Sequence, residues 1–386
     1  MKPLLIPVAA VFTVCFIFSE PTSEGSEKRP ISTNSEKSNT KIQAAILLDV
    51  SNSMDGLIDQ AKAQLWNMVS VMGRAKCNEA VPKIEIALYE YGRTTNDVKQ
   101  GYVKQISSFT TDLDQLSQEL FKLTTNGGDE YCGHVIHTSL DQLNWDTSSS
   151  DYKVIFIAGN EDFLQGDITY TLACNEARKK GVIINTIYCG DRMQGIKEHW
   201  NLNAECGSGS FSNINQDAKV EDIPTPYDST LFLLNQKLNG TYLVYGYSGG
   251  LNYSKQATVD AMNMNFNKSA TAKRTAIKAN KQLYNNSEWD MVDALERDSS
   301  FVSKVDIKTL PDSLKNKSRS QLKQIVKEKT EERGAIQKEI LSINNKRENY
   351  IAAEKAKAAQ TNAPTLETEI EKVIKEQAKR FNMIIQ

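Results

Sequence analysis

Six segments between residues 42 and 214 have the length and the hydrophobic pattern of β-strands. Their apolar residues run continuously or alternate with polar ones. A continuous apolar run, as in the first segment, is typical of a strand that is buried on both faces of a sheet. The predicted strands are IQAAILLDV (42–50), KIEIALYEYG (83–92), GYVKQISSF (101–109), YKVIFIAGN (152–160), VIINTIYCG (182–190) and GSFSNI (209–214).

Between these segments, apolar residues recur every three or four positions, which is typical of amphipathic helices. The first predicted helix carries Leu57, Ala61, Leu65, Met68 and Met72. Others are predicted at 112–123, 134–143 and 170–181, the last ending at Gly181, a residue suited to a helix C-terminus. Strands that alternate with such helices indicate a doubly wound, mostly parallel α/β sheet, in which ligands bind beyond the carboxyl ends of the strands.

From about residue 221 onward, helical spacing replaces the strand pattern. One long helix is predicted at 319–359, with an apolar repeat near seven residues that Lys329, Arg333 and Arg347 interrupt. A C-terminal helix follows NAPT (362–365), and the two helices are predicted to pack as an antiparallel hairpin. Two interpretations remain open for this region: a helical appendage docked on its own domain, which is favoured, or a coiled coil that binds a partner.

The amino terminus has the pattern of a secretory signal peptide: one lysine, an apolar run, and then small and polar residues. An uncleaved anchor is the alternative, but the run is short against the roughly 20 residues that a bilayer requires. We therefore predict a signal peptide (1–19), a disordered linker (20–41), an α/β domain (42–220) and a helical region (221–386). The mature protein is expected to be exported to the periplasm or cell envelope, without insertion into the membrane.

Charge and cysteine content narrow the function further. The 386 residues carry a net charge of -2, so the chain has no excess of basic groups to neutralise phosphates, which argues against a general nucleic-acid binder. After signal cleavage five cysteines remain, an odd number. An exported protein can form disulfides, and at least one thiol would then stay free or pair between molecules.

Polar oxygens follow the first buried strand at alternate positions. Asp49 ends that strand, and Ser51 and Ser53 come next. Alternate residues leaving a strand point to one side, and one carboxylate with two hydroxyls suits a hard cation such as Mg²⁺ or Mn²⁺. The alternative is a polar turn, in which Ser53 caps the following helix and Asp49 accepts bonds from backbone amides.

The stretch ILLDVSNSM resembles the first motif of von Willebrand factor A-type (vWA) domains and their metal-ion-dependent adhesion site (MIDAS). ALYEYG, GGDEYCG, FIAGNEDF and GSGSF follow in the order of such a domain, over roughly residues 42 to 220, and together with the helical C-terminal half they resemble an exported bacterial branch. The resemblance implies a vWA-like fold and a non-catalytic domain that binds a protein partner through a divalent cation. The expected cation is Mg²⁺, with Mn²⁺ or Ca²⁺ as alternatives.

Two departures from the family pattern affect the predicted ligands. Where such domains place a threonine in the second loop, this chain has Asp129 or Glu130, of which Glu130 is favoured. Where the third loop usually has an aspartate, Gly159 stands, followed by Asn160 and Glu161. These four polar residues complete the predicted ligand set. A second anionic ligand is expected to maintain cation affinity and to weaken the attraction of an acidic partner.

Catalysis is not predicted. Cys132, His134 and His137 lie close in sequence, but no second pair with zinc-ligand spacing accompanies them. A hydrolase that uses Cys132 and His134 is a further hypothesis, which no glycine-rich elbow supports. The favoured function is an envelope interaction module with an unidentified protein partner. The alternative is an envelope scaffold that acts through its helical half and retains a vestigial metal site.

Overall fold

The computed structural model describes residues 40–77, 80–215, 217, 223–358 and 366–385. The predicted signal peptide and all but the last two residues of the predicted linker lie outside these ranges. No helix in the described part of the chain is both long enough and apolar enough to cross a membrane.

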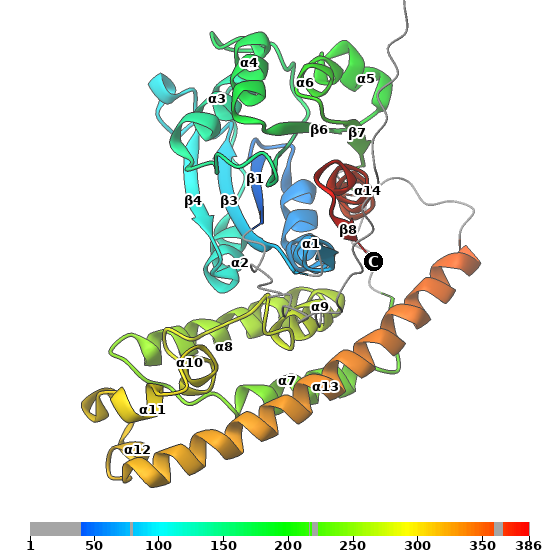
Figure 1. The fold of residues 1–386 in the computed structure, drawn as a ribbon. Helices are drawn as coiled ribbons and strands as arrows, with labels where there is room; N and C mark the ends of the chain where they lie inside the picture. Colours follow the sequence, from blue (N-terminus) through cyan, green and yellow to red (C-terminus); the bar gives the residue numbers. More distant parts are fainter. Residues whose placement is uncertain (1–39, 78–79, 216, 218–222, 359–365, 386) are drawn as a thin grey trace, which may run out of the picture. The chain divides into compact units, whose positions relative to one another are not determined.

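A six-stranded sheet forms the centre of the first half of the chain (Figure 1). Its order is β4-β3-β1-β5-β6-β7, and every neighbouring pair is parallel except β3 and β4. The strands are β1 (Lys41–Asp49), β3 (Lys83–Tyr91), β4 (Lys104–Thr110), β5 (Tyr152–Gly159), β6 (Ile183–Cys189) and β7 (Phe211–Ile214). The predicted doubly wound, mostly parallel fold is thereby confirmed, and all six predicted strands are present.

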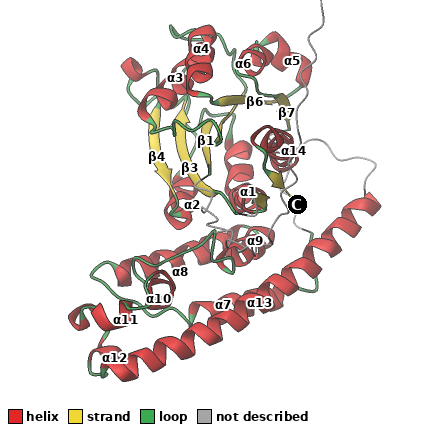
Figure 2. Ribbon diagram, viewed as in Figure 1, coloured by secondary structure: helices red, strands yellow, loops and turns green. Residues whose placement is uncertain are grey.

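Helices cover both faces of this sheet, as Figure 2 shows. The side chains of β1 alternate between two apolar cores: Ile42 and Ala44 belong to one, and Ala45 and Leu47 belong to the other. The first core includes α1 (Asp55–Gly73) and α2 (Leu113–Lys122), and the second includes α3 (Cys132–Gln142), α4 (Tyr170–Lys180) and α6 (Trp200–Cys206). The short α5 (Arg192–Lys197) follows β6. A parallel sheet requires cover on both faces because every strand is apolar on both sides.

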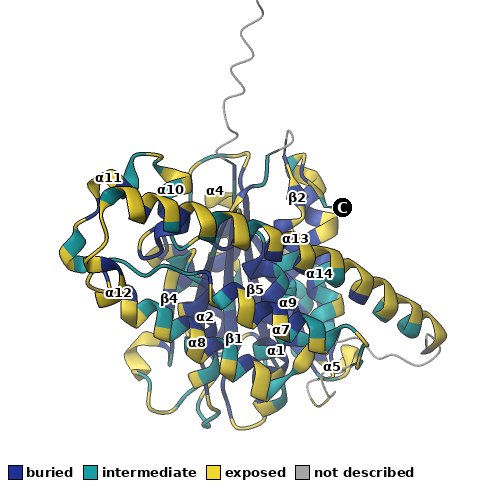
Figure 3. Cartoon of the chain, turned by 90° about the horizontal axis from the view of Figure 1, so that it is seen from below, coloured by how far each residue is buried: buried dark blue, intermediate teal, exposed yellow. Residues whose placement is uncertain are grey.

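The chain after β7 is helical, as predicted. Its helices are α7 (Asp228–Asn239), α8 (Gly249–Phe266), α9 (Lys268–Lys278), α10 (Met291–Arg297), α11 (Phe301–Lys304), α12 (Asp312–Lys315) and α13 (Arg319–Ala358). Helix α13 packs on α7, α9, α10 and α11. Its face away from them is exposed, and Figure 3 shows this exposure along its C-terminal part.

The two arginines that interrupt the apolar repeat of α13 are buried in ion pairs. Arg333 Nη1 lies 2.6 Å from Asp290 and 2.8 Å from Asp293. Arg347 Nε lies 2.9 Å from Asp228. These charges therefore fix α13 to the other helices of its own region, because a buried guanidinium is tolerated only when it is paired and hydrogen-bonded.

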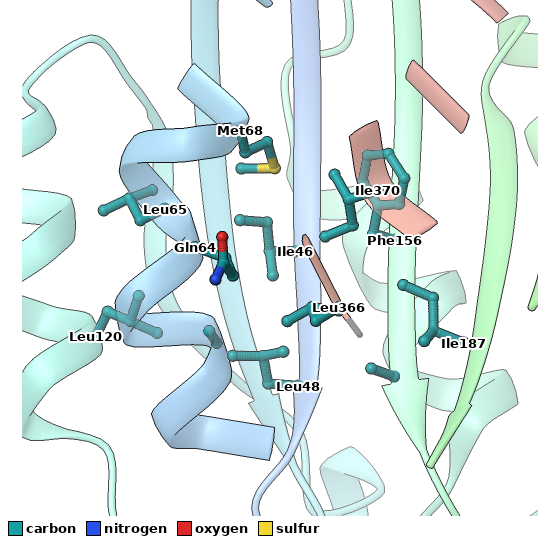
Figure 4. Close-up of a pocket in the computed structure, with 12 residues that line it drawn as sticks. Ile46, Leu48, Gln64, Leu65, Met68, Leu120, Phe156, Ile187, Leu366 and Ile370 are labelled. Carbon is teal, nitrogen blue, oxygen red and sulfur yellow. The ribbon is translucent and has the colours of Figure 1, made fainter. Parts of the chain in front are cut away.

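The predicted hairpin of the last two helices is wrong. Helix α14 (Leu366–Ala378) packs against α1 and β7, and α13 packs on other helices. Leu366 and Ile370 of α14 and residues of α1, β1, β5 and β6 line a small cavity of about 30 Å³ (Figure 4). The apolar face of α14 therefore completes the cover of the sheet, which would otherwise expose this part of its core to water.

The last residues of the chain also join the α/β part. Beyond α14, β8 (Ile384–Ile385) pairs antiparallel with β2 (Ala75–Lys76), which directly follows α1. On α14 itself, Gln377 accepts a hydrogen bond from the hydroxyl of Tyr152 at 2.9 Å. The helical region thus lies in sequence between β7 and the last helix of the α/β part.

Candidate metal centre at the carboxyl end of the sheet

The candidate site lies where three neighbouring strands end. Asp49 is the last residue of β1, and it pairs with Tyr91 at the end of β3. On the other side Leu48 pairs with Ala158, so the next residue of β5, Gly159, lies beside Asp49. The parallel register brings these strand ends to one edge, where doubly wound sheets bind their ligands.

Asp49 is fully buried, and only one of its two carboxylate oxygens is satisfied. Its Oδ1 accepts the backbone N–H of Ser51 at 2.7 Å, while Oδ2 has no hydrogen-bond partner. Burial raises the pKa of this carboxyl to about 7. The backbone N–H and the hydroxyl of Ser51 and the backbone N–H of Asn160 oppose the rise, and the negative charge of Glu161 adds to it. A buried carboxylate with an unpaired oxygen is energetically unfavourable unless a cation or a proton reaches it.

The two serines differ in their surroundings. Ser51 is buried, and its Oγ has no hydrogen-bond partner. Ser53 is exposed, and its Oγ accepts a hydrogen bond from Nδ2 of Asn160 at 3.2 Å. The alternative in which Ser53 caps the helix is wrong, because α1 begins at Asp55 and its N-cap, Met54, makes no side-chain cap bond. The other part of that alternative, in which Asp49 accepts a hydrogen bond from a backbone N–H, is confirmed.

Glu130 and Asp129 point to different surroundings. Glu130 is buried beside Asp49: a Cβ on Gly92 would lie 3.1 Å from Oδ1 of Asp49 and 3.7 Å from Oε1 of Glu130. Asp129 is exposed, and its carboxylate accepts a hydrogen bond from the hydroxyl of Tyr131 at 3.4 Å. Burial, followed by the charges of Asp49 and Glu161, raises the pKa of Glu130 to about 8.

Gly159 leaves no room for the side chain that vWA-type domains usually carry in the third loop. A Cβ there would lie 2.5 Å from the hydroxyl of Tyr91 and 3.0 Å from Oδ2 of Asp49. The Tyr91 hydroxyl is fixed in place because it donates to the carbonyl of Ala158 at 3.0 Å. Sequence reasoning did not find Tyr91, although the alternation of KIEIALYEY places it on the same face as the buried Tyr89.

The two remaining predicted ligands lie just beyond Gly159. Asn160 has a buried Oδ1 without a hydrogen-bond partner. The side chain of Glu161 is exposed, and its carbonyl accepts the indole N–H of Trp200 at 2.8 Å. Glu161 therefore acts on the site through its charge, whereas Asn160 offers it a neutral oxygen.

The residues at this edge fit a hard divalent cation in their chemistry. Three buried oxygens without hydrogen-bond partners come from Asp49, Ser51 and Asn160, and the buried carboxylate of Glu130 adds a second negative group. Carboxylate, hydroxyl and amide oxygens are ligands of Mg²⁺, Mn²⁺ and Ca²⁺. Within the described residues, no three His, Cys, Asp or Glu side chains form a metal-binding group. A cation here would therefore depend on hydroxyl and amide oxygens as well as on carboxylates.

The cysteine and histidine residues of α3 do not form a second site. The buried thiol of Cys132 donates to the hydroxyl of Tyr91 at 3.8 Å, and burial raises its pKa well above the ordinary value. His137 is half-buried, and its Nδ1 lies 2.6 Å from Oε2 of Glu176 on the neighbouring helix α4. Cys77, Cys132 and Cys189 are free and buried, while Cys174 is disulfide-bonded. A thiol held in its neutral form is a poor nucleophile and a poor metal ligand.

Comparison with known proteins adds a likeness of fold. No protein-family model matches the sequence, and no curated protein matches it. The solved structures it resembles include two that are described as VWA or von Willebrand factor type A. Proximal thread matrix protein 1 from the mussel byssus, solved with a zinc-occupied MIDAS motif, is 13% identical over 45% of this chain and 42% of that one, with a TM-score of 0.34. The SpRpn10 VWA domain is 13% identical over 47% of this chain and 91% of its own, with a TM-score of 0.35.

A third such structure is the von Willebrand factor type A protein from Catenulispora acidiphila, 14% identical over 46% of this chain and 39% of that one, with a TM-score of 0.34. The chain spans less than half the length of the byssal protein it matches. At these values the assignment of the fold rests on the sheet itself. Its doubly wound order, with Asp49 at the carboxyl end of the second parallel strand from the β4 edge, agrees with the vWA resemblance.

Proposed function

We propose that this protein is a non-catalytic interaction module that holds a divalent cation at the carboxyl end of its sheet. The observation that carries the proposal is the unpaired Oδ2 of the fully buried Asp49, next to the unpaired Oγ of Ser51 and the buried carboxylate of Glu130. Leaving a buried polar group unpaired costs about 1–3 kcal/mol, and more when it is charged. A cation removes that cost.

Asp49, Ser51 and Glu130 would bind the cation most directly, and Asn160 and Ser53 lie beside them. Asp129 is the weakest candidate because its carboxylate faces Tyr131. A bound Mg²⁺, Mn²⁺ or Ca²⁺ supplies the positive charge that offsets the two buried carboxylates. The three loops that carry these residues would then be fixed relative to one another, and together they present a surface to a partner.

The predicted export places this surface in the periplasm or at the cell envelope, where a protein partner of unidentified sequence would meet it. A scaffold function of the helical region is the second candidate. It is favoured by one observation, the largely exposed C-terminal part of α13, which is available for contact. In that case the carboxyl edge of the sheet would contribute nothing to partner binding.

A matched pair of substitutions tests the ligand assignment. Glu130→Gln is expected to weaken the binding of Mg²⁺ and Mn²⁺ by roughly tenfold or more, because it removes one of two anionic ligands and keeps the shape of the side chain. Asp129→Asn is the control and is expected to change the affinity for the cation by less than about twofold, because the charge of this exposed side chain is screened by water and salt. Isothermal titration calorimetry on both variants measures the difference. Equal affinities would remove Glu130 from the site.

A further inference from the structure

The loops around the candidate metal centre are strongly acidic. Four segments meet at this edge of the sheet: residues 49–55, 92–94, 124–131 and 160–167. They contain seven carboxylates and one basic residue, Arg93. The carboxylates belong to Asp49, Asp55, Asp129, Glu130, Glu161, Asp162 and Asp167. The next segment, 190–199, includes α5 and does not change the balance, because it adds Asp191 and Glu198 but also Arg192 and Lys197.

The single arginine does not neutralise this face. Its Nε lies 3.1 Å from the buried Glu90, and its guanidinium also donates to the carbonyl of Thr124. In the segment 190–199, the ring of His199 lies 3.0 Å from Asp162. Asp55, Asp129, Glu161 and Asp167 are all exposed to solvent. Most of the negative charge is therefore presented outward.

A second feature shows that the cluster surrounds a binding position. At its centre lie Oδ2 of Asp49 and Oγ of Ser51, both buried and both without a hydrogen-bond partner. Oδ2 lies toward Gly159, where any Cβ would be only 3.0 Å away. Unpaired buried acceptors are rare in folded proteins, and they indicate a ligand that the chain itself does not supply.

Aromatic rings stand beside the exposed carboxylates. The rings of Tyr131 and Tyr102 meet edge to face with their centroids 5.7 Å apart, and His134 lies 5.4 Å from Tyr131. The hydroxyl of Tyr131 donates to Asp129. Aromatic faces next to carboxylates attract lysine and arginine side chains by cation–π and ionic interactions together.

We propose that this acidic face docks a basic segment of a protein partner, with lysine or arginine side chains against Asp129, Asp167 and Tyr131. A divalent cation offsets two of the seven negative charges, so the face stays acidic even when the metal centre is occupied. An acidic partner, a nucleic acid or an anionic lipid surface is repelled by the same field. The proposal goes beyond the cation site and stands without it, because the exposed carboxylates of Asp129 and Asp167 are separate from the buried carboxylates of Asp49 and Glu130.

Labelled peptides of equal length test this docking surface on the purified protein. One peptide carries lysine and arginine, and the other carries aspartate and glutamate at the same positions; both are titrated with and without Mg²⁺ at low and physiological salt. The basic peptide is expected to bind, more tightly at low salt, and the acidic peptide is expected not to bind. Asp129→Asn with Asp167→Asn should weaken the basic peptide roughly tenfold.

The matched control is Glu331→Gln with Glu339→Gln, which removes two exposed carboxylates from α13 and should leave the affinity unchanged. Equal weakening in both double variants, no binding of the basic peptide, or Mg²⁺-dependent binding of the acidic peptide overturns the docking surface. The heat of Mg²⁺ binding, measured on the same samples, separates the two proposals. Peptide binding without Mg²⁺ binding rejects the cation site and supports the acidic face. Mg²⁺ binding without binding of the basic peptide supports the cation site and rejects the acidic face.

Discussion

Replacing Arg274 with alanine is expected to lower the free energy of unfolding by about 3–5 kcal/mol, the usual effect of removing one partner from a buried ion network. Arg274 is 1% exposed. Its Nη1 lies 2.6 Å from Asp114 and its Nε lies 2.6 Å from Asp260. Without the guanidinium, the buried Asp114 and the mostly buried Asp260 lose their closest positive charge, and only Asp260 keeps a second cation, Lys278.

This network joins the two halves of the chain. Asp114 belongs to α2 of the α/β part, whereas Arg274 and Asp260 belong to α9 and α8 of the helical region. Burial alone would raise the pKa of Asp260, but the charges of Lys278 and Arg274 reverse the shift and lower it. Because its pKa is lower in the folded state, the carboxylate of Asp260 stabilises the fold at pH values above its ordinary pKa near 4. This stabilisation is lost as the pH falls toward the lower pKa of the folded state. Arg274→Ala should therefore lose part of the stability that the ionised Asp260 provides.

Urea unfolding at neutral pH and at pH 3 measures both effects. Arg297→Ala is the matched control, because Arg297 pairs with Glu288 on the surface and both side chains are mostly exposed. The control is expected to lose less than about 1 kcal/mol. A loss that is small and equal in the two variants would contradict the view that the Arg274 network holds the halves together.

Replacing Ile374 with alanine is expected to destabilise the protein by about 2–5 kcal/mol, because the shortened side chain leaves a cavity in the core. Ile374 lies in α14, is fully buried, and belongs to the same apolar core as α1 and the first face of the sheet. The neighbouring Leu366 and Ile370 already border a small cavity there (Figure 4). This part of the core therefore depends on a helix that reaches it from beyond the helical region.

The control is Leu341→Ala on α13, where the side chain is 41% exposed and the expected change is within about 0.5 kcal/mol. Thermal unfolding followed by circular dichroism at 222 nm and by tryptophan fluorescence compares the two. If Ile374→Ala is no more destabilising than Leu341→Ala, α14 does not complete the cover of the sheet.

Much of the fold could be predicted from the sequence because its signals are local. Continuous apolar runs such as 42–48 identify strands that are buried on both faces. Apolar residues that recur every three or four positions identify the helices between them. The ends of those strands then place Asp49 at the ligand-binding edge. Gly181 illustrates the same point, since it ends α4 with the positive φ of 64° that glycine adopts without strain.

The features that could not be predicted depend on contacts between distant segments. The apolar face of α14 is visible in the sequence, but nothing in it distinguishes α1 from α13 as the partner. In the sequence, Arg333 and Arg347 only interrupt an apolar repeat. Their buried ion pairs could not be predicted, because their carboxylate partners lie 40 or more residues away in the chain. In the same way, the close approach of Tyr91 to Gly159 decides which side chains fit at the metal centre, and no spacing rule contains it.

The central claim is that Asp49 holds a divalent cation, and calorimetric titration of the wild type and of Asp49→Ala with Mg²⁺, Mn²⁺ and Ca²⁺ tests it most directly. Asp49→Ala should keep the circular dichroism spectrum of the wild type, because it removes an unfavourably buried carboxylate from the cation-free protein. The wild type is expected to release or absorb heat and to gain in melting temperature with at least one of the three ions, and the variant is expected to do neither. A wild type that shows no heat and no thermal shift with any of the three ions would contradict the claim and leave the helical scaffold as the function.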